Sequence, residues 1–109
     1  MSDKTFYDLP SVSAGRAEAG KLYQEFLRVP AMSAGVYVLA AGATDPQKPH
    51  HEDELYYVVR GRAKVWVASE EQVVKTGSVI FVPAEAEHRF FDIAEELEVL
   101  VVFAPAERE

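Results

Sequence analysis

The sequence predicts an all-β fold, a sandwich or barrel, and three observations support this prediction. From Gly35 onward, short apolar segments alternate with turn residues at the regular spacing that is typical of such folds. The breaks between the segments contain glycine and proline, which favour turns. A chain of 109 residues that is 49% apolar and 27% charged has the size and composition of one globular domain.

Seven segments are expected to form the strands, and the breaks between them define where each strand ends. The RGR stretch at 60–62 fits a three-residue hairpin loop in which Gly61 takes a positive φ. The KTG stretch at 75–77 fits a second turn, and Pro83 ends its strand because it has no N–H to donate. The expected strands are GVYVLAA, ELYYVV, AKVWVAS, QVVK, SVIFVP, HRFFD and LEVLVVF.

Residues 1–30 form an N-terminal segment whose structure the sequence leaves open, and residues 31–109 form the expected barrel. Within the first segment, KLYQEFLRV places four apolar side chains at helical spacing. Its aromatic residues and its position before a strand suit an edge strand equally well. We expect this segment to pack on the barrel or on a partner subunit.

The expected strand at 54–59 is apolar on both faces beyond Glu54. Because alternate side chains of a strand point to opposite sides, Leu55, Tyr57 and Val59 share the face that points away from the core. A strand of this kind is normally covered on both sides. Either the N-terminal segment or a second subunit must cover this outer face, and we expect a homodimer.

Charge and composition exclude several classes of partner. Eighteen acidic and eleven basic residues give a net charge of -7, and no basic cluster could follow a phosphate backbone, so nucleic acid is not expected. The apolar runs are too short to cross a bilayer. The opening residues are acidic and include a proline where a secretory signal needs a long apolar stretch, so we expect a cytoplasmic protein. Without cysteine, any metal must be held by histidine, carboxylate or amide groups.

The three histidines lie in two segments that a β-sandwich can bring together. His50 and Glu54 are four residues apart, which on a strand places both on one face, within reach of one ion. The residues between them, 51–53, are expected to be solvated. In the second segment, a strand ends at Pro83 and a short polar loop delivers His88 to the start of the next strand.

The first of these segments resembles a motif of the cupins, small proteins with a double-stranded β-helix or jelly-roll barrel. That motif runs glycine, five residues, H-x-H, three or four residues, glutamate, six residues and glycine. In EDELYYVVRG, Glu54 is followed after six residues by Gly61, and His50 stands at the position of the second histidine.

The second segment resembles the second cupin motif, which runs glycine, five residues, P-x-G, two residues, histidine, three residues and asparagine. Gly77, Pro83 and His88 occupy their positions in it with matching spacing. Glu85 replaces the last glycine of the motif and Asp92 its asparagine. The two motifs and the strands around them extend the resemblance over residues 35–103.

The first motif departs from the family at Lys48, which stands where the first histidine belongs. A cation beside a divalent ion is unfavourable, so Lys48 is not an expected ligand. The candidates for a fourth ligand are Gln47, whose amide oxygen is usable, and His51, which could join the site only through a bulge. We rank Gln47 ahead of His51.

The resemblance implies a metal-binding cupin, with His50, Glu54 and His88 holding a divalent transition metal ion such as Fe, Mn, Ni or Zn. It also implies a small-molecule substrate and a metal-dependent reaction of the dioxygenase, isomerase or decarboxylase type. Tyr56 and Phe90 are expected to line the pocket. Two alternatives stay open: a non-catalytic binding or sensor protein with a degenerate metal site, and a structural cupin without a ligand.

No residue of the sequence stands out as a separate catalytic acid or base. Two glutamates near His88, Glu85 and Glu87, are the nearest candidates, and neither can be given a role from the sequence.

Overall fold

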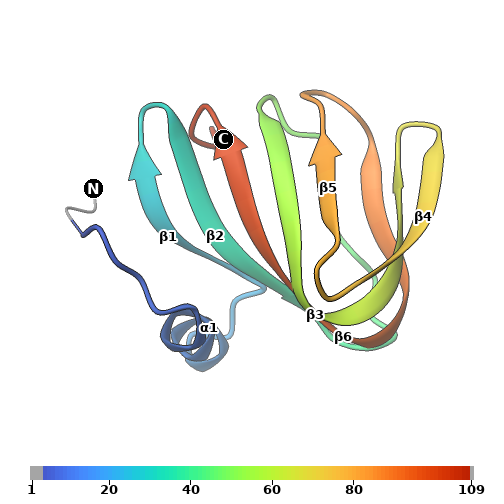
Figure 1. Cartoon of the computed structure of the whole chain (residues 1–109), viewed down its shortest axis with the longest axis horizontal. Coiled ribbons are helices and arrows are strands. Elements are labelled where there is room, and N and C mark those ends of the chain that lie inside the picture. The colour runs from blue at the N-terminus through green and yellow to red at the C-terminus, as the bar shows by residue number, and fades with distance from the viewer. Residues whose placement is uncertain (1–3, 109) are drawn as a thin grey trace.

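The computed structural model describes residues 4–108 and shows a six-stranded antiparallel sheet preceded by one helix (Figure 1). The strand order is β1-β2-β6-β3-β4, and β5 pairs with β3 outside this path. The all-β prediction is therefore confirmed. The elements are α1 (Leu9–Glu18), β1 (Tyr23–Val29), β2 (Met32–Leu39), β3 (Asp53–Val67), β4 (Glu70–Lys75), β5 (Val79–Val82) and β6 (His88–Ala104).

Two long strands, β3 and β6, organise the sheet. They pair along almost their whole lengths, from Asp53 opposite Ala104 to Val67 opposite His88. The first half of β3 also pairs with β5, and its second half pairs with β4. Because the neighbours change along these two strands, the sheet bends along them and curls around one core (Figure 1).

The predicted hairpin at 60–62 is wrong, because β3 continues through these residues. Gly61 does have a positive φ, of 99°, and a Cβ atom there would lie 2.2 Å from the carbonyl oxygen of Glu96. The pairing of β3 with β6 shifts register on both sides of this point. Gly61 therefore serves a bulge that bends a long strand, and a bulge of this kind sharpens the twist of a sheet.

The other strand predictions agree with the structure in position. ELYYVV and AKVWVAS are the two halves of β3, and HRFFD and LEVLVVF are the two halves of β6. GVYVLAA, QVVK and SVIFVP correspond to β2, β4 and β5. The predicted turn before β5 is present, with Gly77 at a φ of 94°, and β5 ends just before Pro83.

The N-terminal stretch whose type the sequence left open is an edge strand, β1, which pairs with β2. The helix lies earlier, where Asp8 caps α1 by accepting a hydrogen bond from the Ser11 N–H at 3.1 Å. It packs against β1 and β2. The division of the chain at residue 30 stays a prediction. In the described part of the chain, no helix is long and apolar enough to span a membrane.

The core lies inside the curled sheet and is formed mainly by β2, β3 and β6, with Val74 of β4 and Val82 of β5. Tyr56 and Val99 are fully buried in it, and Phe90 and Leu97 nearly so. Burial of apolar side chains such as these is the main favourable term in folding.

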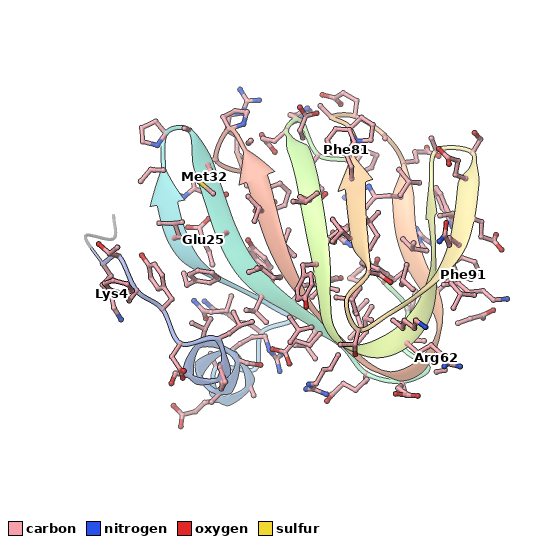
Figure 2. The ribbon with its side chains drawn as sticks, viewed as in Figure 1. Lys4, Glu25, Met32, Arg62, Phe81 and Phe91 are labelled. Atoms are coloured by element: carbon pink, nitrogen blue, oxygen red, sulfur yellow. The ribbon has the colours of Figure 1, made fainter. Side chains whose placement is uncertain are left out.

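The outer face of the sheet is covered unequally. β2 is buried on both faces, but Leu55 and Tyr57 on the neighbouring part of β3 are each 42% exposed. Phe81 and Val79 on β5 lie opposite them in the sheet and are 58% and 61% exposed. Figure 2 labels Phe81 on β5. Residues 4–30, the described part of the N-terminal segment, therefore leave this face exposed. Cover by the N-terminal segment was one of the two alternatives that the sequence left open.

Candidate metal centre

Three side chains predicted as ligands come together inside the sheet, although they belong to different elements. Glu54 is the second residue of β3, His88 is the first residue of β6, and His50 belongs to the loop before β3. The backbone carbonyl of His50 accepts a hydrogen bond from the N–H of Glu85 at 2.7 Å, which holds this loop beside the loop before β6. The two motif segments are therefore adjacent in space.

The potential ligand atoms of the three residues converge on one point. One atom from each of His50, Glu54 and His88 lies within 4.8 Å of the other two. Oε1 of Glu54 is 3.4 Å from Nε2 of His88 and 4.0 Å from Nε2 of His50. The side chains of Glu54 and His88 are each 1% exposed and that of His50 is 21% exposed, so the cluster opens to one side, at His50.

Buried polar atoms of this cluster have no hydrogen-bond partner among the residues that the structure describes. They are Nε2 of His50, Nε2 of His88 and both carboxylate oxygens of Glu54. Leaving such an atom buried and unpaired costs about 1–3 kcal/mol. These are also the atoms that would ligate an ion, so the donor set fits a divalent transition metal.

The second nitrogen of each histidine has a partner that fixes the ring. Nδ1 of His88 is 3.0 Å from the carbonyl oxygen of Ala86, which can only accept, so Nδ1 carries the proton and Nε2 the lone pair. Nδ1 of His50 lies 3.3 Å from Oε2 of Glu107. Such outer partners orient histidine ligands and raise their basicity.

Burial sets the protonation of the cluster when no metal is bound. It raises the pKa of Glu54 to about 8, because the ionised carboxylate is desolvated. Burial, together with the neighbouring His88, lowers the pKa of His50. A neutral imidazole is the ligand form of histidine, and a divalent cation would favour ionisation of Glu54.

The two candidates for a fourth ligand have other partners. The amide oxygen of Gln47 accepts a hydrogen bond from the Tyr56 hydroxyl at 2.9 Å, and its nitrogen donates to Asp45 at 3.0 Å. His51 is 64% exposed in its side chain and pairs with Glu85 at 2.8 Å. The structure therefore does not bring His51 to the cluster, and a role for Gln47 would require its amide to leave Tyr56. Lys48 is exposed.

Two carboxylates at the site were not singled out from the sequence. Asp45 is 1% exposed and accepts hydrogen bonds from the Tyr37 hydroxyl at 2.7 Å and the Phe90 N–H at 3.0 Å, which anchors the loop that carries His50. Glu107 follows the last strand, and its N–H donates to the Ser33 hydroxyl at 2.9 Å. A turn-like Asp-Pro pair at 45–46 was the one available signal for Asp45, and Glu107 had none.

The expectation that residues 51–53 are solvated is wrong for Glu52, which is 1% exposed. Its carboxylate accepts hydrogen bonds from the backbone N–H of Arg108 at 3.2 Å and from Nε of Arg108 at 2.9 Å. Burial alone would raise the pKa of Glu52, but these hydrogen bonds lower it below its ordinary value. The ion pair holds the C-terminal segment, and with it Glu107, against the site.

A cavity of about 220 Å3 adjoins the cluster on the side of His50. Its walls are mainly apolar. They are formed by Leu22, Tyr23, Tyr37, Pro46, Gln47, His50, Glu54, Val101, Phe103 and Glu107.

Tyr56 and Phe90, which were expected to line the pocket, do not line this cavity. Their ring centroids are 5.0 Å apart, and that of Tyr56 is 6.2 Å from that of His88. Both side chains are buried behind the cluster because they pack on each other in the core.

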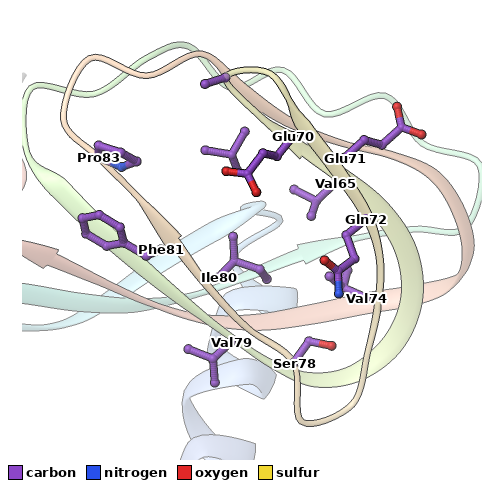
Figure 3. A pocket seen from close by; sticks show the side chains of 12 residues that line it. Val65, Glu70, Glu71, Gln72, Val74, Ser78, Val79, Ile80, Phe81 and Pro83 are labelled. Atoms are coloured by element: carbon purple, nitrogen blue, oxygen red, sulfur yellow. The ribbon is translucent and has the colours of Figure 1, made fainter.

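A larger hollow of about 480 Å3 lies between β4 and β5 (Figure 3). Its walls include Val65, Val74 and Ile80, with Glu70 and Glu71 from β4. None of the three clustered ligands lines it. The smaller cavity is therefore the one connected with the candidate metal centre.

Comparison with known proteins agrees with this geometry. Residues 35–103 match the family described as Cupin domain. The uncharacterized protein SCO3923 of Streptomyces coelicolor is 50% identical over 101 residues, covering 93% of this chain and 96% of that protein.

Solved structures agree on the fold. The structure of TT1209 from Thermus thermophilus superposes with a TM-score of 0.75 at 26% identity, covering 94% of this chain and 99% of that one. That of BH2720 from Bacillus halodurans has a TM-score of 0.80 at 15% identity, covering 99% and 86%. The predicted jelly-roll barrel is confirmed.

Proposed function

The chain belongs to the cupin family, and on this premise we propose that it binds a divalent transition metal through His50, Glu54 and His88 and acts on a small molecule held beside the ion. The observation that carries the proposal is the convergence of buried nitrogen and carboxylate atoms without hydrogen-bond partners among the described residues. Two histidines and one carboxylate form a ligand set that Fe, Mn, Ni and Zn accept.

The bound ion would supply a Lewis acid with coordination positions left for a ligand. The chain supplies the rest of the site. Glu107 and Ala86 orient the two imidazoles, and the cavity beside His50 and Glu54 gives a small molecule a mostly apolar place next to the ligands. A reaction of the dioxygenase, isomerase or decarboxylase type is the proposed use of this arrangement.

A second candidate function is a non-catalytic binding or sensor protein that uses the same site. The observation that favours it concerns the two glutamates near His88. Glu85 and Glu87 are both exposed, and Glu85 pairs with His51 outside the cluster, so neither is placed to transfer a proton at the site.

Thermal unfolding in the presence of metal tests the proposal. A metal at 100 times its dissociation constant adds about 2.7 kcal/mol to the free energy of unfolding, which raises the Tm of a domain of this size by about 10 °C. We expect this rise with at least one of Fe, Mn, Ni or Zn.

Histidine variants complete the test. His50→Ala and His88→Ala should abolish the rise, and His51→Ala, the matched control, should keep it. If no metal stabilises the wild type, or if His50→Ala and His88→Ala keep the full rise, the ligand assignment fails.

We also propose that a second copy of the chain covers the outer face of β3 and β5. The support is an apolar surface on neighbouring strands, formed by Leu55, Tyr57, Val79 and Phe81, together with the packing of α1 against β1 and β2 and not against β3 or β5. A C2 dimer would pair this surface with itself. A cytoplasmic location stays a prediction.

A further inference from the structure

Tyr23 has a hydroxyl group that the fold leaves without a partner at the candidate metal centre. Its oxygen is buried and, among the residues that the structure describes, has no hydrogen-bond partner. Tyr23 lines the cavity together with His50 and Glu54. Burial raises the pKa of Tyr23, so its hydroxyl stays protonated and can donate a hydrogen bond at neutral pH.

The other tyrosines near the site differ in this respect. The hydroxyl of Tyr37, which lines the same cavity, donates to Asp45 at 2.7 Å. The hydroxyl of Tyr56 donates to Gln47 at 2.9 Å. Their donors are therefore used within the protein, whereas the donor of Tyr23 is not used by any described residue.

Gly35 makes the position of the Tyr23 ring possible. Tyr23 on β1 lies opposite Tyr37 on β2, and its ring lies close to Gly35, two residues earlier on β2. A Cβ atom on Gly35 would lie only 2.3 Å from Cζ of Tyr23, closer than real contacts allow. The ring is also edge-on to Phe103, with centroids 6.4 Å apart. The sheet therefore contains a gap that the Tyr23 ring occupies.

The cavity walls limit the chemistry of what can bind there. Among residues 4–108, they include two carboxylates, Glu54 and Glu107, and no lysine or arginine. A phosphate or a dicarboxylate would have no cationic side chain to pair with it and would lie beside these carboxylates. A volume of about 220 Å3 corresponds to about seven liquid water molecules, which admits a molecule of one small ring.

We propose that Tyr23 positions the ligand of the metal centre by donating a hydrogen bond to one of its oxygen atoms, and that this ligand is a small, single-ring-sized oxygen chelator without a phosphate or a second carboxylate. The inference rests on the proposed function, because the chelated ion lies at His50, Glu54 and His88. Tyr23 is a positioning residue in this account.

Titration calorimetry on the Ni(II)-loaded protein tests the inference, with maltol as the probe. Maltol is a small ring compound that binds metals through two oxygen atoms and bears no phosphate or carboxylate. Tyr23→Phe removes only the hydroxyl, and loss of one hydrogen bond should weaken maltol binding about 5- to 10-fold. Ni(II) affinity should not change. Tyr57→Phe, the same change on the exposed outer face, should leave both affinities unchanged.

Two further measurements sharpen the result. Gly35→Ala should displace the Tyr23 ring and weaken maltol binding at least as much as Tyr23→Phe, with Ni(II) still bound. Oxalate and inorganic phosphate should bind the loaded protein more weakly than maltol does, when each is compared with its own affinity for free Ni(II).

The outcomes separate the two proposals. Equal maltol affinity in the wild type and Tyr23→Phe, with Ni(II) bound to both, overturns the role of Tyr23 and leaves the metal centre standing. Oxalate or phosphate binding as strong as that of maltol overturns the ligand class. A wild-type protein that takes up no Ni(II) overturns the metal centre and this inference with it.

Discussion

The two faces of the first half of β3 contrast with each other. On the inner face, Glu54 and Tyr56 are 2% and 0% exposed, and the Glu54 carboxylate is buried with no hydrogen-bond partner in the described chain. On the outer face, Leu55 and Tyr57 are each 42% exposed. A buried carboxyl group without a hydrogen-bond partner and an exposed apolar surface both reverse the usual distribution of side chains.

The contrast indicates that each face is completed by something outside the chain, and that the chemistry of each face identifies it. Nitrogen and carboxylate ligands suit a metal ion, and an apolar sheet surface suits another sheet surface. Alternation along a strand lets neighbouring residues serve the two purposes independently. Substitutions on one face should therefore leave the partner of the other face unaffected.

The largest expected effect is on the inner face. Glu54→Gln keeps the shape of the side chain but removes its charge. We expect it to lower metal affinity by more than about 100-fold, because loss of a ligand should cost more than loss of a residue that only orients a ligand. Equilibrium dialysis against Ni(II) measures this. Glu85→Gln, an exposed glutamate in the neighbouring loop, should bind as the wild type does. Equal affinity in Glu54→Gln and the wild type would remove Glu54 from the site.

The next effect concerns the pH dependence of the metal-free protein. Burial raises the pKa of Glu54 to about 8, above its ordinary value of 4.5. Between these values the folded protein keeps a proton that the unfolded chain releases. The free energy of unfolding should therefore fall as pH rises across this range, on the order of a few kcal/mol.

His50 acts in the opposite sense, because burial lowers its pKa and the unfolded chain takes up the proton first as pH falls. The contribution of His50 to the free energy of unfolding therefore rises as the pH increases through 6.5, the ordinary pKa of histidine. In urea unfolding, the free energy of unfolding of the wild type should fall as the pH rises, and this fall should be absent in Glu54→Gln. Parallel curves for the two proteins would contradict the assigned pKa of Glu54.

On the outer face, Leu55→Asp and Phe81→Asp should dissociate the proposed dimer. A charge introduced at the centre of an apolar interface should raise the dissociation constant by at least about 30-fold, or 2 kcal/mol. Size-exclusion chromatography with light scattering measures the mass. Val73→Asp is the matched control, at a 55% exposed apolar residue of β4, which pairs with the second half of β3 and not with its first half. A wild-type protein that is monomeric at micromolar concentration would refute the interface.

The smallest effect is expected at Glu107, which contacts His50 but is not among the clustered ligands. Glu107→Gln should weaken Ni(II) binding by about 10-fold, because the ring of His50 loses its charged partner. The same dialysis measures it, with Glu87→Gln as the exposed control. A loss as large as that of Glu54→Gln would make Glu107 a direct ligand.

The sequence predicted the parts of the site that depend on local spacing. His50, Glu54 and His88 could be found because motif spacing places them at defined points of two adjacent hairpin-like segments. Glu107 could not be found, because it reaches His50 only after the C-terminal segment folds back onto Glu52, 56 residues before Arg108. Burial of Glu52 follows from the same contact.

The sequence prediction differed from the structure where a local pattern fits two kinds of structure. A positive φ at Gly61 suits a hairpin loop and a bulge equally, and only the pairing of β3 with β6 distinguishes them. In β1 the register shifts between Glu25 and Leu27, which interrupts the alternation of a strand. The apolar spacing around Phe26 therefore resembled that of a helix.

The central claim is that one metal ion is held by the inner face of β3 and its neighbours, and anomalous scattering from a crystal grown with Ni(II) tests it most directly. We predict one strong peak about 2.0–2.2 Å from Nε2 of His50, Nε2 of His88 and a carboxylate oxygen of Glu54. A map without a peak there, or with its strongest peak at the exposed pair of His51 and Glu85, would contradict the account.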